Sequence, residues 1–379
     1  MNSVEIIEKT VPPGTKTAVP ADKDTSIFVA PEWKLVWWKF RKHKVALFSG
    51  IIIMFIYMVA VLVEFLAPFS STATSSKYLY APPQPLQFDG GLYVSGYTSV
   101  VDKASLRRIF VVDPTQKIQV GFFVEGVSYK LFGLLPGNRH LFGPLDPIQP
   151  MYLLGADRLG RDLLSRLIYG TRISMSIGLV GVFFSLILGV VLGGISGYYG
   201  GKVDTVIQRS IELVRSIPQV PLWMGLTAAL TFSLSPEQTY FAITVILSLL
   251  TWPDLARAVR GRFLSLRTED FVMAARLDGA SEGRIIFRHM LPSFFSHIIA
   301  TLTLTIPGTI LAETALSFLG LGLREPVVSW GVLLQDAQDI RSIATAPWLL
   351  IPTLAVVVSI LALNFFGDGL RDAADPYAR

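Results

Sequence analysis

Residues 262–292, RFLSLRTEDFVMAARLDGASEGRIIFRHMLP, form the stretch around which the rest of this chain must be arranged. The stretch separates strongly apolar runs, and seven arginines lie between Arg257 and Arg288. The core of a bilayer does not tolerate so many cations, so we expect this stretch to lie in water beside a membrane. Because cytoplasmic loops carry an excess of Lys and Arg, the stretch is predicted to face the cytoplasm.

The same stretch predicts a helix, a sharp turn and a second helix. Phe271 to Leu277 is rich in good helix formers, and Gly279 then supplies a residue at which a helix can stop and turn. The second helix is predicted from Ser281, a plausible N-cap, to Met290. Small residues at the turn would let another protein's backbone come close, which favours a docking surface; the alternative is an ordinary cytoplasmic loop. The predicted docking residues are Met273, Ala274, Ala275, Asp278, Gly279, Ala280, Ser281 and Glu282.

Three short patterns carry a resemblance to a known family. The spacing Ala274-Ala275-x3-Gly279-x9-His289-x-Leu291-Pro292 resembles the EAA loop of membrane subunits of ATP-binding-cassette importers, particularly the oligopeptide and dipeptide permease group. The family's leading Glu falls on Met273 here. GADRLGRD at 155–162 is similar to that group's Gly-Thr-Asp-x-x-Gly-Arg-Asp signature, with Ala156 in place of Thr. GLGLREPVVSWG at 320–331 is similar to the group's Gly-Leu-Gly…Ser-Trp-Gly stretch.

The resemblance implies a C-type permease subunit of a binding-protein-dependent, ATP-driven importer in the bacterial cytoplasmic (inner) membrane. It implies an all-α polytopic chain with the type I importer fold, six transmembrane helices and both termini inside. The implied partners are a second homologous permease subunit, two cytoplasmic ATP-binding-cassette ATPases and an extracytoplasmic substrate-binding protein. ATP hydrolysis would then reside on the ATPases, and the solute would be a peptide or a similar oligomer such as an oligosaccharide or an opine.

The composition independently favours a membrane protein. Hydrophobic residues make up 51% of the chain, charged residues 16%, and the mean hydropathy is +0.52, which is too apolar for a soluble globular protein. The basic pI of about 9.3 does not indicate nucleic acid, because the cations crowd around the ends of apolar runs and no nucleic-acid motif appears. The absence of cysteine excludes disulfides and thiol nucleophiles, and the four histidines form no metal-binding motif. The sequence therefore predicts no catalytic residue, metal site or cofactor.

Apolar runs and turn residues divide the chain into four parts. Residues 1–44 are predicted to form a polar cytoplasmic tail that ends in an interfacial helix on membrane lipid; the alternative for its end is a charged flank with incidental tryptophans. Residues 45–67 form the first predicted transmembrane helix. Residues 68–153 are predicted to be a small β-rich extracytoplasmic insert. Residues 154–379 are predicted to be the permease core, with five further transmembrane helices and the docking stretch 262–292.

Local patterns predict details of the insert and of the core. In the insert, two strands at 109–112 and 118–124 are predicted to be joined by a turn at Asp113-Pro114-Thr115-Gln116. In the core, Gly189, Gly193 and Gly197 predict a close approach of two helices. The five core spans are predicted near 173–198, 204–230, 240–255, 293–319 and 348–366.

Prolines and charges modify two of these spans. Pro218 and Pro221 are expected to kink the span at 204–230, where Glu212 and Arg215 would form a local ion pair. Pro307-Gly308 is expected to interrupt the span at 293–319.

Two acidic residues of the core stand out. Glu313 lies well inside an apolar run, and lipid would not accept its charge. A hydrogen bond to a neighbouring helix and a role in the translocation path are equally compatible with this position, so Glu313 is a candidate path residue. Asp162 is predicted to cap the helix that follows it.

A secondary transporter that is not coupled to ATP hydrolysis is the alternative from another functional class. Such a carrier usually shows inverted repeats and ionisable residues near the membrane midplane. This sequence shows no convincing repeat and few charges within its apolar runs. We therefore favour the ATP-driven importer.

Overall fold

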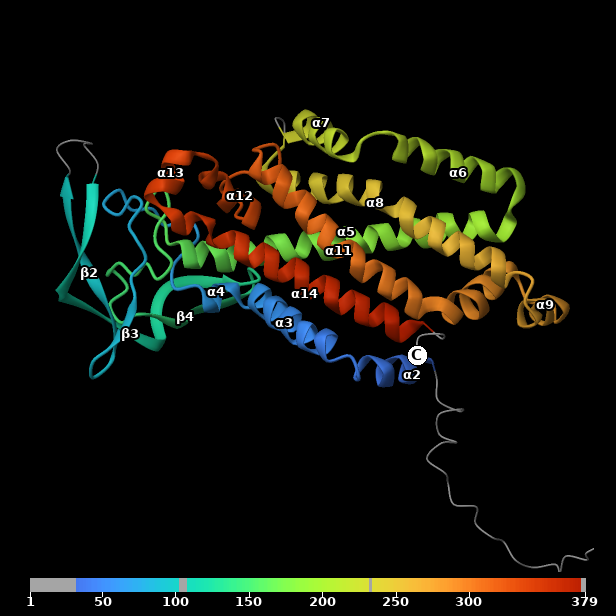
Figure 1. Cartoon of the computed structure of the whole chain (residues 1–379), viewed down its shortest axis with the longest axis horizontal. Coiled ribbons are helices and arrows are strands. Elements are labelled where there is room, and N and C mark those ends of the chain that lie inside the picture. Colours follow the sequence, from blue (N-terminus) through green and yellow to red (C-terminus); the bar gives the residue numbers. More distant parts are fainter. Residues whose placement is uncertain (1–31, 102–107, 232–233, 376–379) are drawn as a thin grey trace, which may run out of the picture.

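The computed structural model describes residues 32–101, 108–231 and 234–375. Figure 1 shows an elongated molecule in which long helices run along the longest axis, with a β-sheet at one end and the short helix α9 at the other. The helices are α2 (Glu32–Phe40), α3 (Lys44–Val61), α4 (Val63–Leu66), α5 (Leu163–Tyr199), α6 (Gly201–Ser216), α7 (Gln219–Thr231), α8 (Pro236–Leu266), α9 (Asp270–Leu277), α10 (Glu282–Arg284), α11 (Phe295–Phe318), α12 (Trp330–Gln335), α13 (Ile340–Thr345) and α14 (Ile351–Ala374).

Five helical segments within the described ranges are long and apolar enough to cross a membrane. They are Lys44–Val61, Leu163–Tyr199, Gln238–Leu266, Glu282–Phe318 and Pro347–Ala374. They correspond to the first, second, fourth, fifth and sixth predicted spans.

The predicted third span, 204–230, is broken rather than kinked. Helix α6 ends at Ser216 and α7 begins at Gln219. Pro218 disfavours a helical conformation for the residue before it, and Ile217 is extended, with φ −88° and ψ 130°. Neither half is long enough to span alone, although Figure 1 shows the two halves following one another along the molecule. The count of six spans therefore stays a prediction.

Helix α5 packs along α8 through its glycine face, as predicted. A Cβ added at Gly189 would lie 2.7 Å from the Leu255 side chain, and one at Gly197 would lie 2.7 Å from the Arg260 carbonyl oxygen. A Cβ at Gly193 would run into the backbone of Ala256. The absence of side chains at these three residues lets the two backbones approach closely.

Two predicted details of the core are wrong. Pro307 lies inside α11, which runs unbroken from Phe295 to Phe318, so Pro307-Gly308 does not interrupt the span. Glu212 does not pair with Arg215 but with Arg209, at 2.6 Å. Arg215 instead forms an ion pair with Asp254 of α8, which runs antiparallel to α6 (Figure 1).

The insert is a four-stranded antiparallel sheet with the strand order β1-β2-β3-β4. The predicted turn at 113–116 is wrong, because both predicted strands belong to one long strand, β3. Opposite Ser95 and Gly96 the register jumps from Lys117 to Asp113, so residues 114–116 bulge out of the strand. The Asp113 carboxylate accepts hydrogen bonds from the Thr115 amide and hydroxyl and so holds this bulge. The strands are β1 (Leu86–Phe88), β2 (Leu92–Val101), β3 (Arg108–Leu131) and β4 (Leu135–Pro144).

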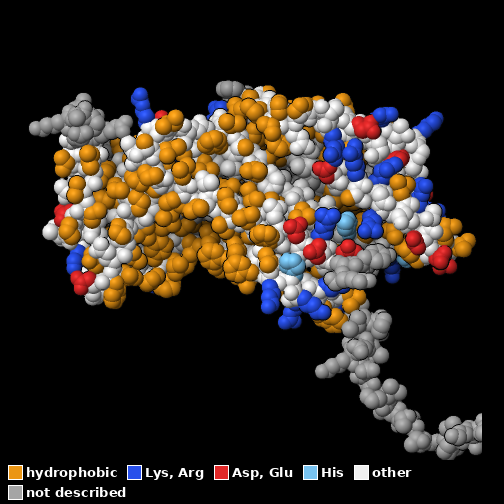
Figure 2. All heavy atoms as spheres, viewed as in Figure 1, with side chains coloured by type: hydrophobic (Ala, Val, Ile, Leu, Met, Phe, Trp, Pro, Cys, Tyr) orange, Lys and Arg blue, Asp and Glu red, His pale blue; other side chains and the backbone are white. Residues whose placement is uncertain are grey.

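Both ends of the described chain lie at the α9 end of the molecule. Figure 1 places α2 and the C-terminal end of α14 there, opposite the sheet. Figure 2 shows that Lys and Arg side chains gather at this end, whereas hydrophobic side chains cover the middle. This distribution supports the predicted orientation, with the α9 end in the cytoplasm and the sheet outside.

Candidate functional site

The predicted turn of the docking stretch is present at Gly279. Helix α9 ends at Leu277, and Gly279 adopts φ +74°, a left-handed conformation that favours glycine. The Gly279 amide donates to the Arg276 carbonyl and the Ala280 amide donates to the Ala275 carbonyl, both at 3.0 Å. This pair of bonds is a Schellman motif, which satisfies carbonyls left open at the helix end.

The second predicted helix is also present, in an irregular form. The chain continues as α10, then as a π-helical segment at Ile285–Met290 and a 3₁₀ segment at Leu291–Phe294, and so enters α11. Ser281 occupies the N-cap position of α10, but its side chain makes no capping hydrogen bond. The stretch therefore joins α8 to α11 through two short helical elements.

The docking stretch has a buried inner face. Val272 and Ala275 of α9 and Ile285 and Met290 of the following helix are buried. They share one hydrophobic cluster with residues of α8, including Phe263, and with the start of α11. This cluster fixes the turn relative to both spans.

The outer face carries exposed apolar side chains and most of the predicted docking residues. Leu277 is 86% exposed and Phe287 65% exposed. Ala275 faces the core and is buried, and Ala280 is half-buried. The docking residues exposed on this surface are Met273, Ala274, Asp278, Gly279, Ser281 and Glu282.

The end of α5 also holds the docking stretch. The Tyr199 hydroxyl donates to the Glu282 carboxylate at 2.7 Å, and the Arg276 guanidinium lies 5.4 Å from the centre of the Tyr198 ring. Next to this contact, Arg260 of α8 donates to both carboxylate oxygens of Asp204 on α6, at 2.5 and 2.6 Å. The turn is therefore tied to α5, α8 and α11 together.

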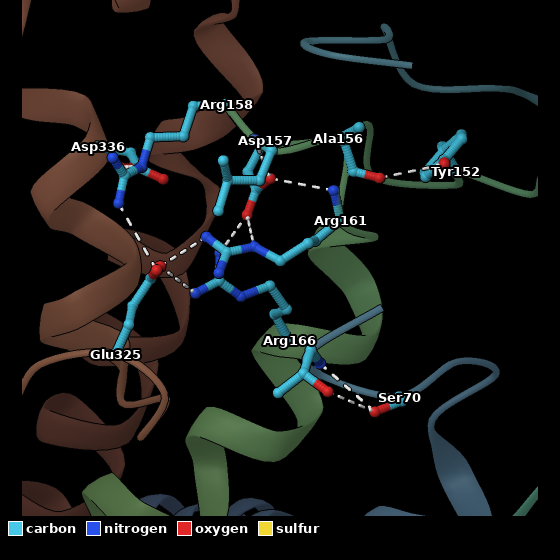
Figure 3. A network of polar contacts seen from close by, with 12 residues as sticks. Ser70, Tyr152, Ala156, Asp157, Arg158, Arg161, Arg166, Glu325 and Asp336 are labelled. Atoms are coloured by element: carbon cyan, nitrogen blue, oxygen red, sulfur yellow. Dashed lines mark hydrogen bonds and ion pairs between the residues drawn. The ribbon is translucent and has the colours of Figure 1, made fainter. Parts of the chain in front are cut away.

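A second polar site lies at the opposite end, where α5 begins (Figure 3). The Asp157 carboxylate accepts hydrogen bonds from Arg161 Nε at 2.7 Å and from Arg166. The Glu325 carboxylate accepts from Arg161 Nη2 at 2.5 Å and from Arg166 Nη2 at 2.9 Å. Figure 3 shows the two guanidinium groups between the two carboxylates, so they join the loop before α5 to the loop after α11.

The charges of this network are withdrawn from water. The side chains of Asp157 and Arg166 are each 1% exposed. Partial burial acts to raise the pKa of Glu325, but the hydrogen bond and charge of Arg161, with Arg166, outweigh it and lower the pKa to about 2. Removing one member of a buried ion pair leaves an uncompensated charge, which costs about 3–5 kcal/mol. The network therefore fixes one arrangement of these loops.

Sequence reasoning found one residue of this region and missed the others. Asp162 caps α5 as predicted, with its Oδ2 accepting from the Ser165 amide at 2.7 Å. Arg161, Arg166 and Glu325 were not predicted as a cluster. The available signal was the presence of several Asp, Glu and Arg residues in two short segments of an otherwise apolar chain.

Glu313, the candidate path residue, is fully buried in α11. Its Oε1 accepts from the Ser317 hydroxyl at 2.8 Å and from the Ser329 hydroxyl at 2.7 Å. Ser329 is the N-cap of α12, so Glu313 joins α11 to α12. Its Oε2 has no hydrogen-bond partner among the described residues. These contacts support the hydrogen-bonding alternative, and a role of Glu313 in the path stays a prediction.

Two protein families match this chain. Residues 189–379 match the family described as "Binding-protein-dependent transport system inner membrane component". Residues 32–83 match "N-terminal TM domain of oligopeptide transport permease C". The first match includes the docking stretch and Glu313, and the second includes α2 and α3.

Named relatives and solved structures resemble the chain to different degrees. The oligopeptide transport system permease protein OppC of Haemophilus influenzae is 41% identical over 229 residues, which are 60% of this chain and 71% of that protein. The dipeptide transport system permease protein DppC of Alkalihalophilus pseudofirmus is 39% identical over 242 residues, 64% of this chain and 75% of that protein. An inward-facing structure of the MetNI methionine ABC transporter matches with a TM-score of 0.45 and 20% sequence identity. The match covers 56% of this chain and 98% of the chain in that structure.

Proposed function

The chain belongs to the family of binding-protein-dependent transport system inner membrane components, and from this premise we propose that it forms half of the pathway of an ATP-driven peptide importer. It is a multi-pass permease subunit of the inner membrane, a transport component and not an enzyme. Peptides are the proposed solutes because the relatives are named oligopeptide and dipeptide permeases. The family assignment does not favour the alternative, a secondary transporter.

The proposed assembly contains four kinds of subunit. A second homologous permease would complete the pathway, two cytoplasmic ATPases would dock at the α9 end, and a substrate-binding protein would deliver peptides at the sheet end. The proposed topology is the type I importer fold, with six spans and both termini inside. Both described ends lie toward the α9 end of the molecule rather than the sheet end (Figure 1), which supports this topology.

The observation that carries the coupling mechanism is the two-faced docking stretch. Its outer face presents Leu277 and Phe287 beside the open turn at Gly279, a surface that suits insertion into a groove of another protein. Its inner face is fixed to α8 and α11 by the buried cluster and to α5 by the bond between Tyr199 and Glu282. When ATP brings two ATPases together, an element held in this way would move with them and tilt three spans at once.

Replacement of Gly279 by Asp tests this mechanism. A Cβ at Gly279 has no atom within 4 Å, so Gly279→Asp causes no clash within the chain. The positive φ costs about 1 kcal/mol, and the added carboxylate would face the docked ATPase. A loss of a few kcal/mol at such an interface lowers occupancy by orders of magnitude. We expect Gly279→Asp to insert in the membrane but to lose the ATPases, or to hydrolyse ATP without transport.

Gly261→Asp is the matched control. Gly261 is exposed on α8, also has free space at its Cβ position, and lies outside the turn. Both variants are purified by a tag on this subunit, and ATPase recovery and peptide uptake into liposomes are measured. Wild-type recovery and uptake for Gly279→Asp would show that the stretch is an ordinary cytoplasmic loop.

A further inference from the structure

A cavity of about 730 Å³ opens at the cytoplasmic end of the helices, away from the docking turn. Helix α2, the end of α8, the start of α11 and the end of α14 form its walls. The charged side chains that line it are Lys39, Lys42, Arg262, Arg371 and Asp375, and the His297 imidazole lies among them.

The lining carries an excess of positive charge. Lys39 Nζ donates to the backbone carbonyl of Asp375 at 2.8 Å. Lys42, Arg262 and Arg371 form no ion pair with any carboxylate in the described part of the chain. Four Lys and Arg side chains thus face one cavity together with a single carboxylate, Asp375, among the described lining residues. Such a cluster attracts a phosphate group.

A second cavity of about 350 Å³ continues from the first toward the membrane. The two cavities share His297 and Arg371, and the second extends along α11 past Thr301, Leu304 and Thr305. Thr305 lies two helical turns beyond His297, roughly 12 Å along the axis. The candidate membrane span Glu282–Phe318 begins within the docking stretch, so the second cavity runs along this span from its water-facing end toward its apolar part.

The second cavity is lined by Thr301, Leu304 and Thr305 together with His297 and Arg371. The Thr301 hydroxyl donates to the carbonyl of His297, and the Thr305 hydroxyl donates to the carbonyl of Thr301, so both hydroxyls are bound within their own helix. Leu304 adds an apolar side chain to this lining, and His297 and Arg371 lie at the end that the second cavity shares with the first. This lining suits the glycerol and upper acyl region of a lipid better than an ion in water.

Helix α2 holds this site at the membrane surface. Phe40 of α2 is buried against Ala46 and Ala373, and its ring packs edge-on against Phe366 of α14, with 5.4 Å between the ring centroids. Trp37 and Trp38 remain exposed, as tryptophans at a membrane interface are. Trp38 also lines the basic cavity, so one short helix contributes both the interfacial anchor and part of the basic lining.

We propose that the two cavities together bind one anionic phospholipid of the cytoplasmic leaflet. Its phosphate would lie among Lys39, Lys42, Arg262 and Arg371, and its glycerol ester and upper acyl chain would follow α11 past Thr301. Basic pockets between transmembrane helices on the cytoplasmic side are sites of this kind. The inference rests on the position of the helices in the membrane and is independent of the transported solute.

Lipid titration of the full-length chain tests the proposal. Delipidated protein in a mild detergent is titrated with phosphatidylglycerol and separately with phosphatidylcholine, and native mass spectrometry counts the bound lipids. We expect one phosphatidylglycerol to bind in preference to phosphatidylcholine. The double variant Arg262→Gln/Arg371→Gln should weaken this binding roughly 25-fold, because each cation near an anionic lipid contributes about a factor of five.

A matched variant separates the cavity from general attraction to anionic lipid. Arg41 and Arg257 are exposed near the same end of the chain but do not line either cavity. Arg41→Gln/Arg257→Gln removes the same charge and should leave the preferred lipid bound. An equal loss in both double variants, or no preference for phosphatidylglycerol in the wild type, would overturn the proposal.

A further experiment distinguishes the binding of a lipid from the binding of a free phosphate ion. Thr301→Phe fills the second cavity without a change in charge, so it should weaken phosphatidylglycerol binding, and inorganic phosphate should not displace the lipid. Displacement by inorganic phosphate, together with full lipid binding by Thr301→Phe, would show that the cavity holds a phosphate ion and would overturn the lipid assignment. Size-exclusion profiles and thermal melts confirm that each variant is folded.

Discussion

Asp162 shows how one residue combines a local role with an environment that only the fold creates. Its Oδ2 caps α5 by accepting from the amide and the hydroxyl of Ser165, at 2.7 and 2.6 Å. The packed loops around it bury the carboxylate, and its Oδ1 has no partner among the described residues. Burial raises the pKa of Asp162 to about 6, against the opposing effect of the bonds from Ser165.

We predict that Asp162→Asn removes a pH dependence of stability. The folded pKa of about 6 exceeds the unfolded value of about 3.9. The stability that the Asp162 carboxyl group contributes to the folded protein is therefore complete below about pH 4 and is lost as pH rises through 6. The shift corresponds to about 3 kcal/mol at most. Asparagine caps helices as well as aspartate and stays neutral. In thermal melts of the detergent-solubilised protein, the melting temperature of Asp162→Asn relative to that of the wild type should therefore rise between pH 5 and pH 8.

Glu325 does not obscure this measurement. Its folded pKa of about 2 is lower than the unfolded value, so the stability it contributes is present above about pH 4.3 and is lost only as pH falls toward 2. Identical pH profiles for the wild type and Asp162→Asn above pH 5 would show that the Asp162 carboxylate is better solvated than its burial indicates.

At the residue scale, local roles could be predicted and distant partners could not. The cap at Asp162 and the turn at Gly279 follow from neighbours within a few positions, so their chemistry is visible in the sequence. The contact between Arg166 and Glu325 joins residues that are 159 positions apart. No local pattern specifies such a pair, because it depends on how the helices pack.

At the element scale, periodicity and composition predicted most helices but not their breaks. The glycine repeat of α5 has helical spacing, so its packing face could be foreseen. The break between α6 and α7 could not be distinguished from a kink, because a proline allows both. The two short strands around 113–116 turned out to be one strand, because a bulge and a turn use the same Asp and Pro residues.

Gly193 tests the close packing of α5 on α8. A Cβ at Gly193 would run into the backbone of Ala256, which can move only if the helices separate. Gly193→Ala should therefore destabilise the protein by about 1–3 kcal/mol, the usual cost of overpacking. The measurement is the apparent melting temperature of the purified chain in detergent.

The neighbouring Gly194 provides the control for this substitution. A Cβ at Gly194 would lie 3.5 Å from the Phe263 ring, an ordinary contact. Alanine also has a higher helix propensity than glycine, so Gly194→Ala should be neutral or slightly stabilising. Equal melting temperatures for the two variants would contradict the close approach of α5 and α8.

At the scale of the whole molecule, the proposed orientation can be tested by labelling introduced cysteines, because the sequence itself contains none. Thr115 lies on the sheet and Ser281 on the docking stretch, at opposite ends, and both are exposed. In intact cells whose outer membrane admits the reagent, a membrane-impermeant maleimide should label Thr115→Cys but not Ser281→Cys. Both cysteines should react after the membrane is opened. Labelling of Ser281→Cys in intact cells would reverse the proposed topology.

The sheet is the part of the molecule whose role depends on a partner. It packs on the loops at its base, where Tyr97 shares a hydrophobic cluster with Tyr152 and Val94 shares one with Met151, so its removal exposes these loop residues. The two chain segments that lead to it meet at its base, where the Gln84 amide donates to the Tyr152 carbonyl at 2.9 Å and the Tyr152 amide donates to the Gln84 side chain at 2.6 Å. A short Gly/Ser linker can therefore replace residues 86–144. The ion pairs of Asp157, Arg166 and Glu325 lie outside the deleted segment.

We predict that this deletion leaves membrane insertion and basal ATP hydrolysis unchanged but weakens the stimulation of hydrolysis by the substrate-binding protein. The sheet lies at the end opposite α9, so it can contact a partner outside the membrane without touching the docked ATPases. The measurement compares hydrolysis by the reconstituted complex with and without loaded binding protein, and basal activity serves as the internal control. Full stimulation after the deletion would mean that the sheet only covers the permease and does not seat the binding protein.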